Sequence, residues 1–274
     1  MALALDIITI GVPQVEAART FYTSYTSTFS TPTTDDDGHT AVLDLHGTGQ
    51  LALHPLDALA TGTGTPLKSS GFPGYVLSTI VSQPAEVKAL LDAATANGAA
   101  VVKPAKKGLF GEFTAVYQAP DGAVWKLTAA SKKDTDRIPT VPKPTETAVF
   151  LGVAKPKASK VFYEALGMRT DRDYGNKFVD FTIAGGGSRL GLLSRKALAK
   201  DAGVDEHGDG AGTLVLTHTA ASRDDVDALL AAAHSSGGRV TATGSPTGQG
   251  EYAGHFTDPD GYHWKIAAAE RRQS

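Results

Sequence analysis

Cysteine is absent from the 274 residues, which excludes disulfides, thiolate metal sites and cysteine nucleophiles. Long apolar runs are missing as well, because no window approaches the roughly 18 consecutive apolar residues of a membrane-spanning helix. The opening residues, Met1 to Asp6, lack a charged segment and a long apolar segment, so we expect no signal peptide. Together these absences favour a cytoplasmic protein.

A large excess of charge of either sign is also lacking. The net charge is -3 and the two signs are mixed along the chain, with no basic block or cationic amphipathic helix. We therefore expect neither nucleic acid nor membrane as a partner. The glycine run Gly185 to Gly187 is not followed by Lys-Ser or Lys-Thr, and no Gly-x-Ser-x-Gly elbow occurs. A phosphate-binding loop and a hydrolase triad are not expected.

A short stretch occurs twice in the chain. Residues 111–127 read GEFTAVYQAPDGAVWKL and residues 250–266 read GEYAGHFTDPDGYHWKI, at a constant offset of 139. Each copy predicts a strand, a Pro-Asp-Gly turn and a second strand, since Pro presets φ for a turn and Gly supplies the positive φ that a hairpin needs. Two such hairpins at one offset indicate an internal duplication.

The remaining elements repeat in the same way. Residues 5–12 are predicted to form a strand, residues 15–22 a helix, residues 41–45 and 50–54 two paired strands, and residues 84–94 an amphipathic helix. The second half repeats this order, so we expect an α+β protein of four βαβββ modules. The proline-rich segment 131–145 is predicted to link a first domain, 1–130, to a second, 146–274. Each half has enough modules to pair internally, which favours a monomer, with a homodimer as the alternative.

These features resemble the vicinal oxygen chelate superfamily, which includes glyoxalase I, bleomycin-resistance proteins and extradiol dioxygenases. The resemblance covers nearly the whole chain apart from the linker, and it is fairly specific because each signal occurs twice. It implies two tandem glyoxalase-like domains with curled sheets around a bowl where ligands bind. The residues that carry it are Phe21-Tyr22, Phe162-Tyr163, Ala119-Pro120-Asp121-Gly122 and Asp258-Pro259-Asp260-Gly261.

The resemblance also implies where a metal would bind. Enzymes of this superfamily commonly hold a divalent metal with a His or Gln on the first strand and a Glu on the last. The corresponding positions here are Ile7 and Ala148 on the first strands, and Lys126 and Lys265 on the last strands. Ile and Ala have no lone pair, and a protonated Lys has no acceptor. We therefore expect no metal at these positions and no cofactor.

The resemblance implies that Lys126 and Lys265 face the bowl. Two ammonium groups there would suit an anionic or carbonyl-bearing ligand, and a desolvated Lys could act as a base or nucleophile. The alternative is that each Lys pairs with the nearby hairpin carboxylate, Glu112 or Glu251, or extends into water. The preceding Trp125 and Trp264 fall on the opposite face and are predicted to lie in the core.

Three residues of the second half form another candidate site. His218 and His255, with Glu251, could make an atypical metal or acid–base site. The alternative is that both are ordinary histidines at the surface or the core edge. Strand alternation does not decide between these interpretations, since a one-residue slip reverses every side chain.

Three functional hypotheses follow. The first is a metal-independent, small-molecule binding protein of the glyoxalase/bleomycin-resistance type. The second is an enzyme of the superfamily (a lyase, isomerase or dioxygenase) that uses a non-standard site in the second domain. The third is a catalytically silent protein that acts through partner contacts.

Overall fold

The computed structural model describes residues 2–24, 33–34, 40–63, 71–108, 111–135, 141–185, 187–208, 213–248 and 250–269. Within these residues the predicted α+β class and the four βαβββ modules are confirmed. Part of the predicted linker, 136–140, lies outside the described residues.

The four modules have the following bounds. The first module has β1 (Ile7–Val12), α1 (Val15–Ser24), β2 (Thr33–Thr34), β3 (Ala41–Asp44) and β4 (Gln50–Pro55). The second has β5 (Tyr75–Val81), α3 (Pro84–Ala96), β6 (Ala100–Lys107), β7 (Phe113–Gln118) and β8 (Val124–Ala129). The third has β9 (Glu146–Val153), α4 (Pro156–Ala165), β10 (Thr170–Asp173), β11 (Val179–Phe181) and β12 (Arg189–Ser194). The fourth has β13 (Leu214–Thr219), α6 (Arg223–Ser235), β14 (Arg239–Pro246), β15 (Glu251–Thr257) and β16 (His263–Ala269).

Local sequence signals explain several of these boundaries. Helices α3 and α4 carry a proline in their first turn, where a missing N–H costs no intrahelical bond. Helix α6 begins after Ser222, whose hydroxyl accepts a hydrogen bond from the Asp225 amide. The two Pro-Asp-Gly turns end in Gly122 and Gly261, both with φ of 93°, a value that glycine adopts without strain.

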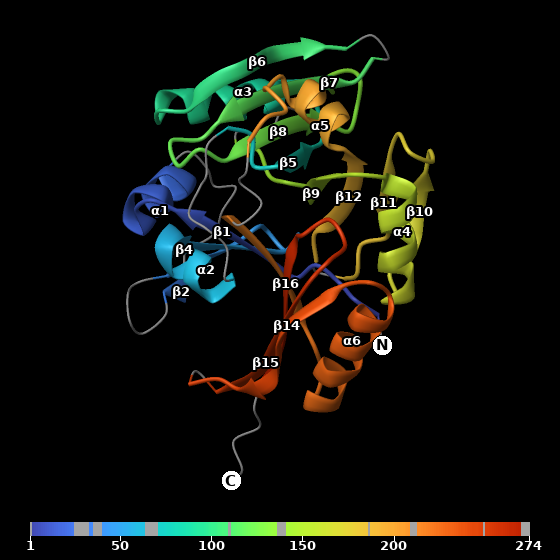
Figure 1. Cartoon of the computed structure of the whole chain (residues 1–274). Coiled ribbons are helices and arrows are strands. Elements are labelled where there is room, and N and C mark those ends of the chain that lie inside the picture. Colours follow the sequence, from blue (N-terminus) through green and yellow to red (C-terminus); the bar gives the residue numbers. More distant parts are fainter. Residues whose placement is uncertain are drawn as a thin grey trace.

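The strands form two sheets that exchange modules between the halves of the chain. One sheet has the order β14-β15-β16-β13-β1-β4-β3-β2 and joins the fourth module to the first. The other has the order β10-β11-β12-β9-β5-β8-β7-β6 and joins the third module to the second. The expectation that each half pairs its own modules in one sheet is therefore wrong (Figure 1). The boundaries 1–130, 131–145 and 146–274 stay a prediction about the duplicated sequence.

Two antiparallel strand pairs make the exchange. In the first sheet β1 pairs with β13, and in the second sheet β5 pairs with β9. A sequence half contains only one partner of each pair, so period-2 patterning within that half cannot reveal the exchange. A single chain nevertheless completes both sheets.

The two modules of each half remain packed together on the convex sides of the sheets. In the first half the ring of Tyr22 on α1 lies 5.8 Å from that of Trp125 on β8. In the second half Tyr163 on α4 lies 6.0 Å from Trp264 on β16. Both tryptophans are fully buried, as predicted. Aromatic side chains of this size dominate core energetics, so these clusters hold the two sheets against each other.

Two short helices, which the sequence analysis did not anticipate, lie on the concave side. Helix α2 (Leu56–Thr63) follows β4, and α5 (Arg195–Ala202) follows β12 at the same offset of 139. Figure 1 shows α5 beside the strands of the second sheet. Among the described residues, no helix has both the length and the apolar character to cross a bilayer.

Candidate ligand-binding site

The concave face of the first sheet presents one continuous row of side chains. The register places Ile7 opposite Thr217, Thr217 beside Lys265, and Lys265 opposite His255. A second row, two residues along, contains Thr9 and Val215. Side chains two apart on a strand point to the same face. The row from β1 to β15 is therefore shared by the first and last modules of the chain.

A cavity of about 500 Å³ lies over these rows. Aliphatic side chains from both modules form its walls, and threonine hydroxyls, two imidazoles and one ion pair are the polar groups. Such a mixture is typical of small-molecule sites, where apolar surface supplies affinity and a few polar groups fix orientation. The lining residues are Ile7, Thr9, Val42, Ala52, His54, Ala58, Leu59, Val215, Thr217, Thr219, Thr247, Glu251, His255, Lys265, Ala267 and Ala269.

The polar groups gather around Lys265. Its Nζ atom lies 2.7 Å from Glu251 Oε2. The ammonium is therefore paired with the hairpin carboxylate, which was the alternative considered from the sequence. Burial lowers the pKa of His255, and the neighbouring Lys265 charge lowers it further. Its imidazole is therefore neutral at pH 7, with one ring nitrogen able to accept a proton.

The concave face of the second sheet is filled by the protein itself. Phe150 on β9 stands where β1 carries Thr9, and its ring occupies the space that a Cβ on Gly191 would need. Helix α5 adds Leu198, Ala199 and Ala202 to the same buried cluster. The duplicated chain thus has one open concave face and one that is packed shut.

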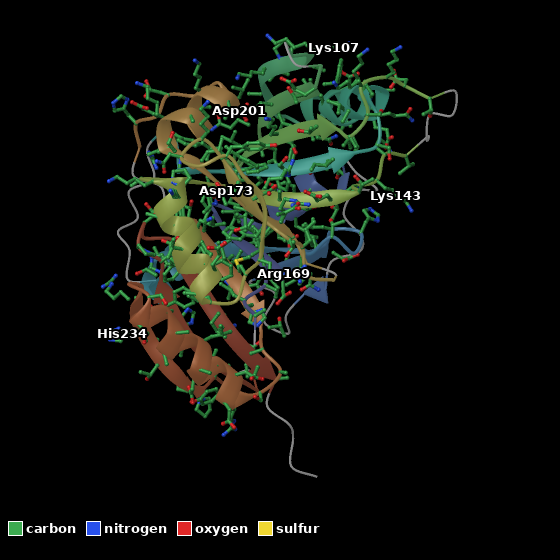
Figure 2. The ribbon with its side chains drawn as sticks, turned by 90° about the vertical axis from the view of Figure 1, so that its right-hand side faces the viewer. Lys107, Lys143, Arg169, Asp173, Asp201 and His234 are labelled. Atoms are coloured by element: carbon green, nitrogen blue, oxygen red, sulfur yellow. The ribbon has the colours of Figure 1, made fainter. Side chains whose placement is uncertain are left out.

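Lys126 belongs to this closed face. Its Nζ atom lies 2.6 Å from Asp201 Oδ2 at the end of α5 (Asp201 is labelled in Figure 2), not beside Glu112. Lys103, in the same row, donates to the backbone carbonyls of Lys200 at 2.9 Å and Asp201 at 2.6 Å. Cations at the end of a helix interact favourably with its dipole. The two lysines therefore hold α5 in place, away from the open cavity.

His218 lies apart from the other two residues of its predicted site. Glu251 and His255 line the cavity, whereas His218 is adjacent to Thr217 on β13 and so points to the opposite face. Its Nδ1 atom lies 3.2 Å from the Ala4 amide nitrogen and 3.2 Å from Asp6 Oδ2. The structure thus brings Glu251 and His255 together with Lys265, and leaves out His218.

The cavity does not fit a divalent metal. Its central row offers an aliphatic side chain, a hydroxyl and an ammonium, at Ile7, Thr217 and Lys265, none of which is a good metal ligand. Among the described residues, no group of three His, Asp or Glu side chains is close enough to hold an ion. The equivalent row of the second sheet contains Ser78, Ala148 and Lys126, which is no better.

Several cavity residues were not identified from sequence. Thr9 lies two residues from Ile7 and Thr217 lies next to His218, but the pairing of β1 with β13 is what brings the two threonines together. His54 was noted only as the end of a strand, and Leu59 belongs to the unanticipated helix α2. The signal that could have revealed α2 is that a helix follows the paired strands at the same place in both halves, as α2 and α5 do at the offset of 139.

Comparisons with known proteins agree with this architecture. The model of the Glyoxalase/Bleomycin resistance protein/Dioxygenase superfamily matches residues 147–266. Glyoxalase I from Zea mays has a similar fold, with 18% identity, a TM-score of 0.65, and coverage of 98% of this chain and 92% of that one. A putative dioxygenase from Bacillus subtilis is similar at 16% identity and a TM-score of 0.62, covering 98% and 86% of the two chains. Comparison with curated proteins by sequence gave no match.

Proposed function

Since the chain belongs to the glyoxalase, bleomycin-resistance and dioxygenase superfamily, its family model matching residues 147–266, we propose that it binds a small organic molecule in the concave cavity of the first sheet. The proposal extends to binding without a resident metal, because the residues at the usual ligand positions do not fit one. The observation that supports it most is the contrast between the two concave faces. One is filled by Phe150 and α5, and the other keeps a cavity of about 500 Å³.

The lining indicates the chemical class of the ligand. Aliphatic walls on both sides favour an apolar body, which gains roughly 25 cal/mol for each Å² removed from water. The Lys265 ammonium has three donors, and Glu251 accepts from one of them. The remaining donors suit a carboxylate or carbonyl oxygen at one end of the ligand. We therefore propose an apolar carboxylate or ketone as the ligand class.

A second candidate function is metal-independent proton transfer. His255 lies opposite Lys265 on neighbouring strands, and its lowered pKa keeps the ring available as a base at neutral pH. In such a reaction His255 would remove a proton next to a ligand carbonyl while the Lys265 ammonium stabilised the negative charge that develops on its oxygen. This would be an isomerase or lyase reaction.

Ligand-observed NMR with a panel of aromatic and aliphatic carboxylates and ketones tests the binding proposal. 1-Naphthoate is the first probe, and neutral naphthalene is its control. We expect naphthoate binding that is lost in Thr9→Phe, since the new ring would occupy the cavity as Phe150 does in the other sheet. If no compound of the panel binds the wild type, or if Thr9→Phe leaves binding unchanged, the proposal is wrong.

Solvent deuterium exchange into bound ketones tests the second candidate. A catalytic His255 would accelerate exchange at the carbon next to the carbonyl, and His255→Gln would remove the acceleration without loss of binding. Exchange at the same rate in both proteins would leave only the binding function.

A further inference from the structure

The two equivalent lysines take their carboxylate partners from different places. Lys126 and Lys265 stand at the same position of the two hairpins, on the concave sides of the two sheets. On the closed face, Lys126 binds the Asp201 carboxylate, which belongs to α5, at 2.6 Å. On the open face, Lys265 binds the Glu251 carboxylate of its own hairpin at 2.7 Å. The closed face therefore shows how a carboxylate from outside the sheet can hold a lysine at this position.

The Asp201 carboxylate is attached to an apolar surface of α5. Leu198 precedes Asp201 by three residues, so the two side chains are neighbours on the helix. Leu198 packs in the buried cluster that contains Val76 and Val116 of the second sheet. One turn of α5 thus presents an apolar body and a carboxylate to the concave face. These are the two parts of the carboxylate ligands proposed for the open cavity.

The open half keeps the apolar residue of this pair and lacks the acidic one. At the offset of 139, Leu59 corresponds to Leu198, and it lines the open cavity together with Lys265. The residue that corresponds to Asp201 is Gly62, which has no side chain. The carboxylate that the closed half supplies from its own chain is therefore missing from the open half, where a cavity lies over the lysine.

The hairpin glutamate binds the lysine only in the half that lacks this aspartate. Glu112 corresponds to Glu251, but its side chain folds against Gly108 while Lys126 is held by Asp201. The Glu251 side chain is 37% exposed, and ion pairs between partly exposed side chains are weak. Glu251 can therefore turn to water at small cost when another carboxylate reaches Lys265.

We infer, on the basis of the proposed binding function, that Glu251 is a displaceable counter-ion: it neutralises Lys265 in the empty cavity and leaves it when an apolar carboxylate enters. The ligand carboxylate then holds Lys265 as Asp201 holds Lys126. If Glu251 stayed, two carboxylates would share one ammonium beside the neutral imidazole of His255, and like charges so close repel each other. Carboxylates are thereby favoured over ketones, because a neutral carbonyl does not replace the charge of Glu251.

Glu251→Gln tests this inference, because it removes the competing charge and keeps the size of the side chain. In isothermal titration calorimetry at pH 7, we expect 1-naphthoate to bind this variant at least three-fold more tightly than the wild type. Neutral 1-naphthamide, which has a similar shape, should change by less than two-fold. Glu112→Gln, the matched variant of the closed half, should leave naphthoate affinity within two-fold. Equal or weaker naphthoate binding in Glu251→Gln would overturn the inference and leave the proposed binding function intact.

A double-mutant cycle separates displacement of Glu251 from a general effect of removing negative charge. In Lys265→Met, Glu251 has no ammonium to hold at this position, so adding Glu251→Gln should change naphthoate affinity by less than two-fold. A general effect of charge would persist in this background, and a three-fold or greater gain there would overturn the inference. Misfolding does not imitate the expected result, since it weakens binding. Absence of naphthoate binding to both the wild type and Glu251→Gln would reject the proposed function, and this inference with it.

Discussion

Thr9 and Phe150 occupy equivalent positions on β1 and β9, and the difference between them separates an open concave face from a closed one. Thr9 lies opposite Val215 and beside Ala52, at the wall of the large cavity. Phe150 lies opposite Val76 and beside Gly191, and packs against the cluster that α5 completes. One duplicated position thus sets how much space each sheet leaves for a ligand.

Exchanging these two residues should exchange the properties of the two faces. Phe150→Thr leaves a void beneath α5, and we expect it to lower the free energy of unfolding by about 1–3 kcal/mol, because Phe150 is only partly buried. Urea denaturation measures this loss. Leu193→Ala, a truncation in the same cluster, is the matched control for general loosening. Unchanged stability in Phe150→Thr would show that the ring does not support α5.

Lys265→Met and Lys126→Met form a matched pair at equivalent positions of the two hairpins. Lys265 lines the open cavity, so its replacement is expected to weaken naphthoate binding at least ten-fold. Lys126 is bound to Asp201 over the closed face, so its replacement should leave naphthoate binding unchanged. Isothermal titration calorimetry of both variants measures the difference.

The Lys126→Met substitution should have only a small effect on the free energy of unfolding. Lys126 and Asp201 are partly exposed, with side-chain exposures of 20% and 45%, so their ion pair contributes no more than about 1 kcal/mol. Weaker naphthoate binding in Lys126→Met than in Lys265→Met would contradict the assignment of the two lysines.

Asp258 is expected to make the protein less stable as the pH rises from about 4 to about 7. Burial raises the pKa of this carboxyl to about 7, against the opposing hydrogen bond from the Tyr163 hydroxyl at 2.6 Å. The unfolded carboxyl titrates near its ordinary value of about 3.9, so between these values the folded state binds more protons. Asp258 therefore contributes a slope of up to about 1.4 kcal/mol per pH unit, negative with rising pH.

Asp258→Asn isolates this contribution. Burial lowers the pKa of His255 and His263, so these histidines favour folding as the pH rises through about 6.5, which is the opposite sign. The difference between wild type and Asp258→Asn, measured by denaturation at pH 4.5 to 7.5, removes the histidine contribution. A difference that is constant with pH would show that Asp258 is ionised throughout.

A chain divided within the linker should give two fragments that associate tightly. Fragments 1–130 and 146–274 each keep their aromatic cluster. The first fragment contains β1 and β5 without their partners β13 and β9, and the second contains β13 and β9 without β1 and β5. We expect the fragments to copurify when coexpressed and to aggregate or self-associate when expressed alone, since unpaired strand edges invite pairing. Size-exclusion chromatography with light scattering distinguishes a 1:1 complex from two independent stable monomers, and the second result would contradict the exchange.

The sequence predicted the modules well because each carries its own local signals. Pro13, the Gly122 turn and the apolar period of residues 15–22 act within a few residues, and the duplication confirmed them at a second place. The burial of Trp125 and Trp264 followed from strand alternation, once the resemblance had placed the adjacent lysines on the bowl-facing side. What local patterning does not contain is the partner of a strand more than a hundred residues away.

The candidate site was therefore only partly predicted. The contact of Lys265 with Glu251 was one of the alternatives that the sequence left open, and the structure shows this pair. The neutral His255 joins them through a strand register that only the structure shows. His218 was grouped with them because it shares a residue type and a sequence half, whereas its strand turns it to the opposite face. Lys126 was treated as the equivalent of Lys265. The two differ because Lys126 pairs with Asp201 of α5, a residue 75 positions along the chain.

The exchange of modules has a consequence for the order in which the protein is synthesised. Strand β1 leaves the ribosome early, but its partner β13 begins at Leu214, 202 residues after Val12. At 5–20 residues per second, β1 waits about 10–40 s with one edge unpaired. The second sheet, by contrast, is built from the continuous stretch between β5 and β12 and can close during that interval. The closed face is thus expected to fold first on the ribosome, and the open cavity to be the last part of the protein to form.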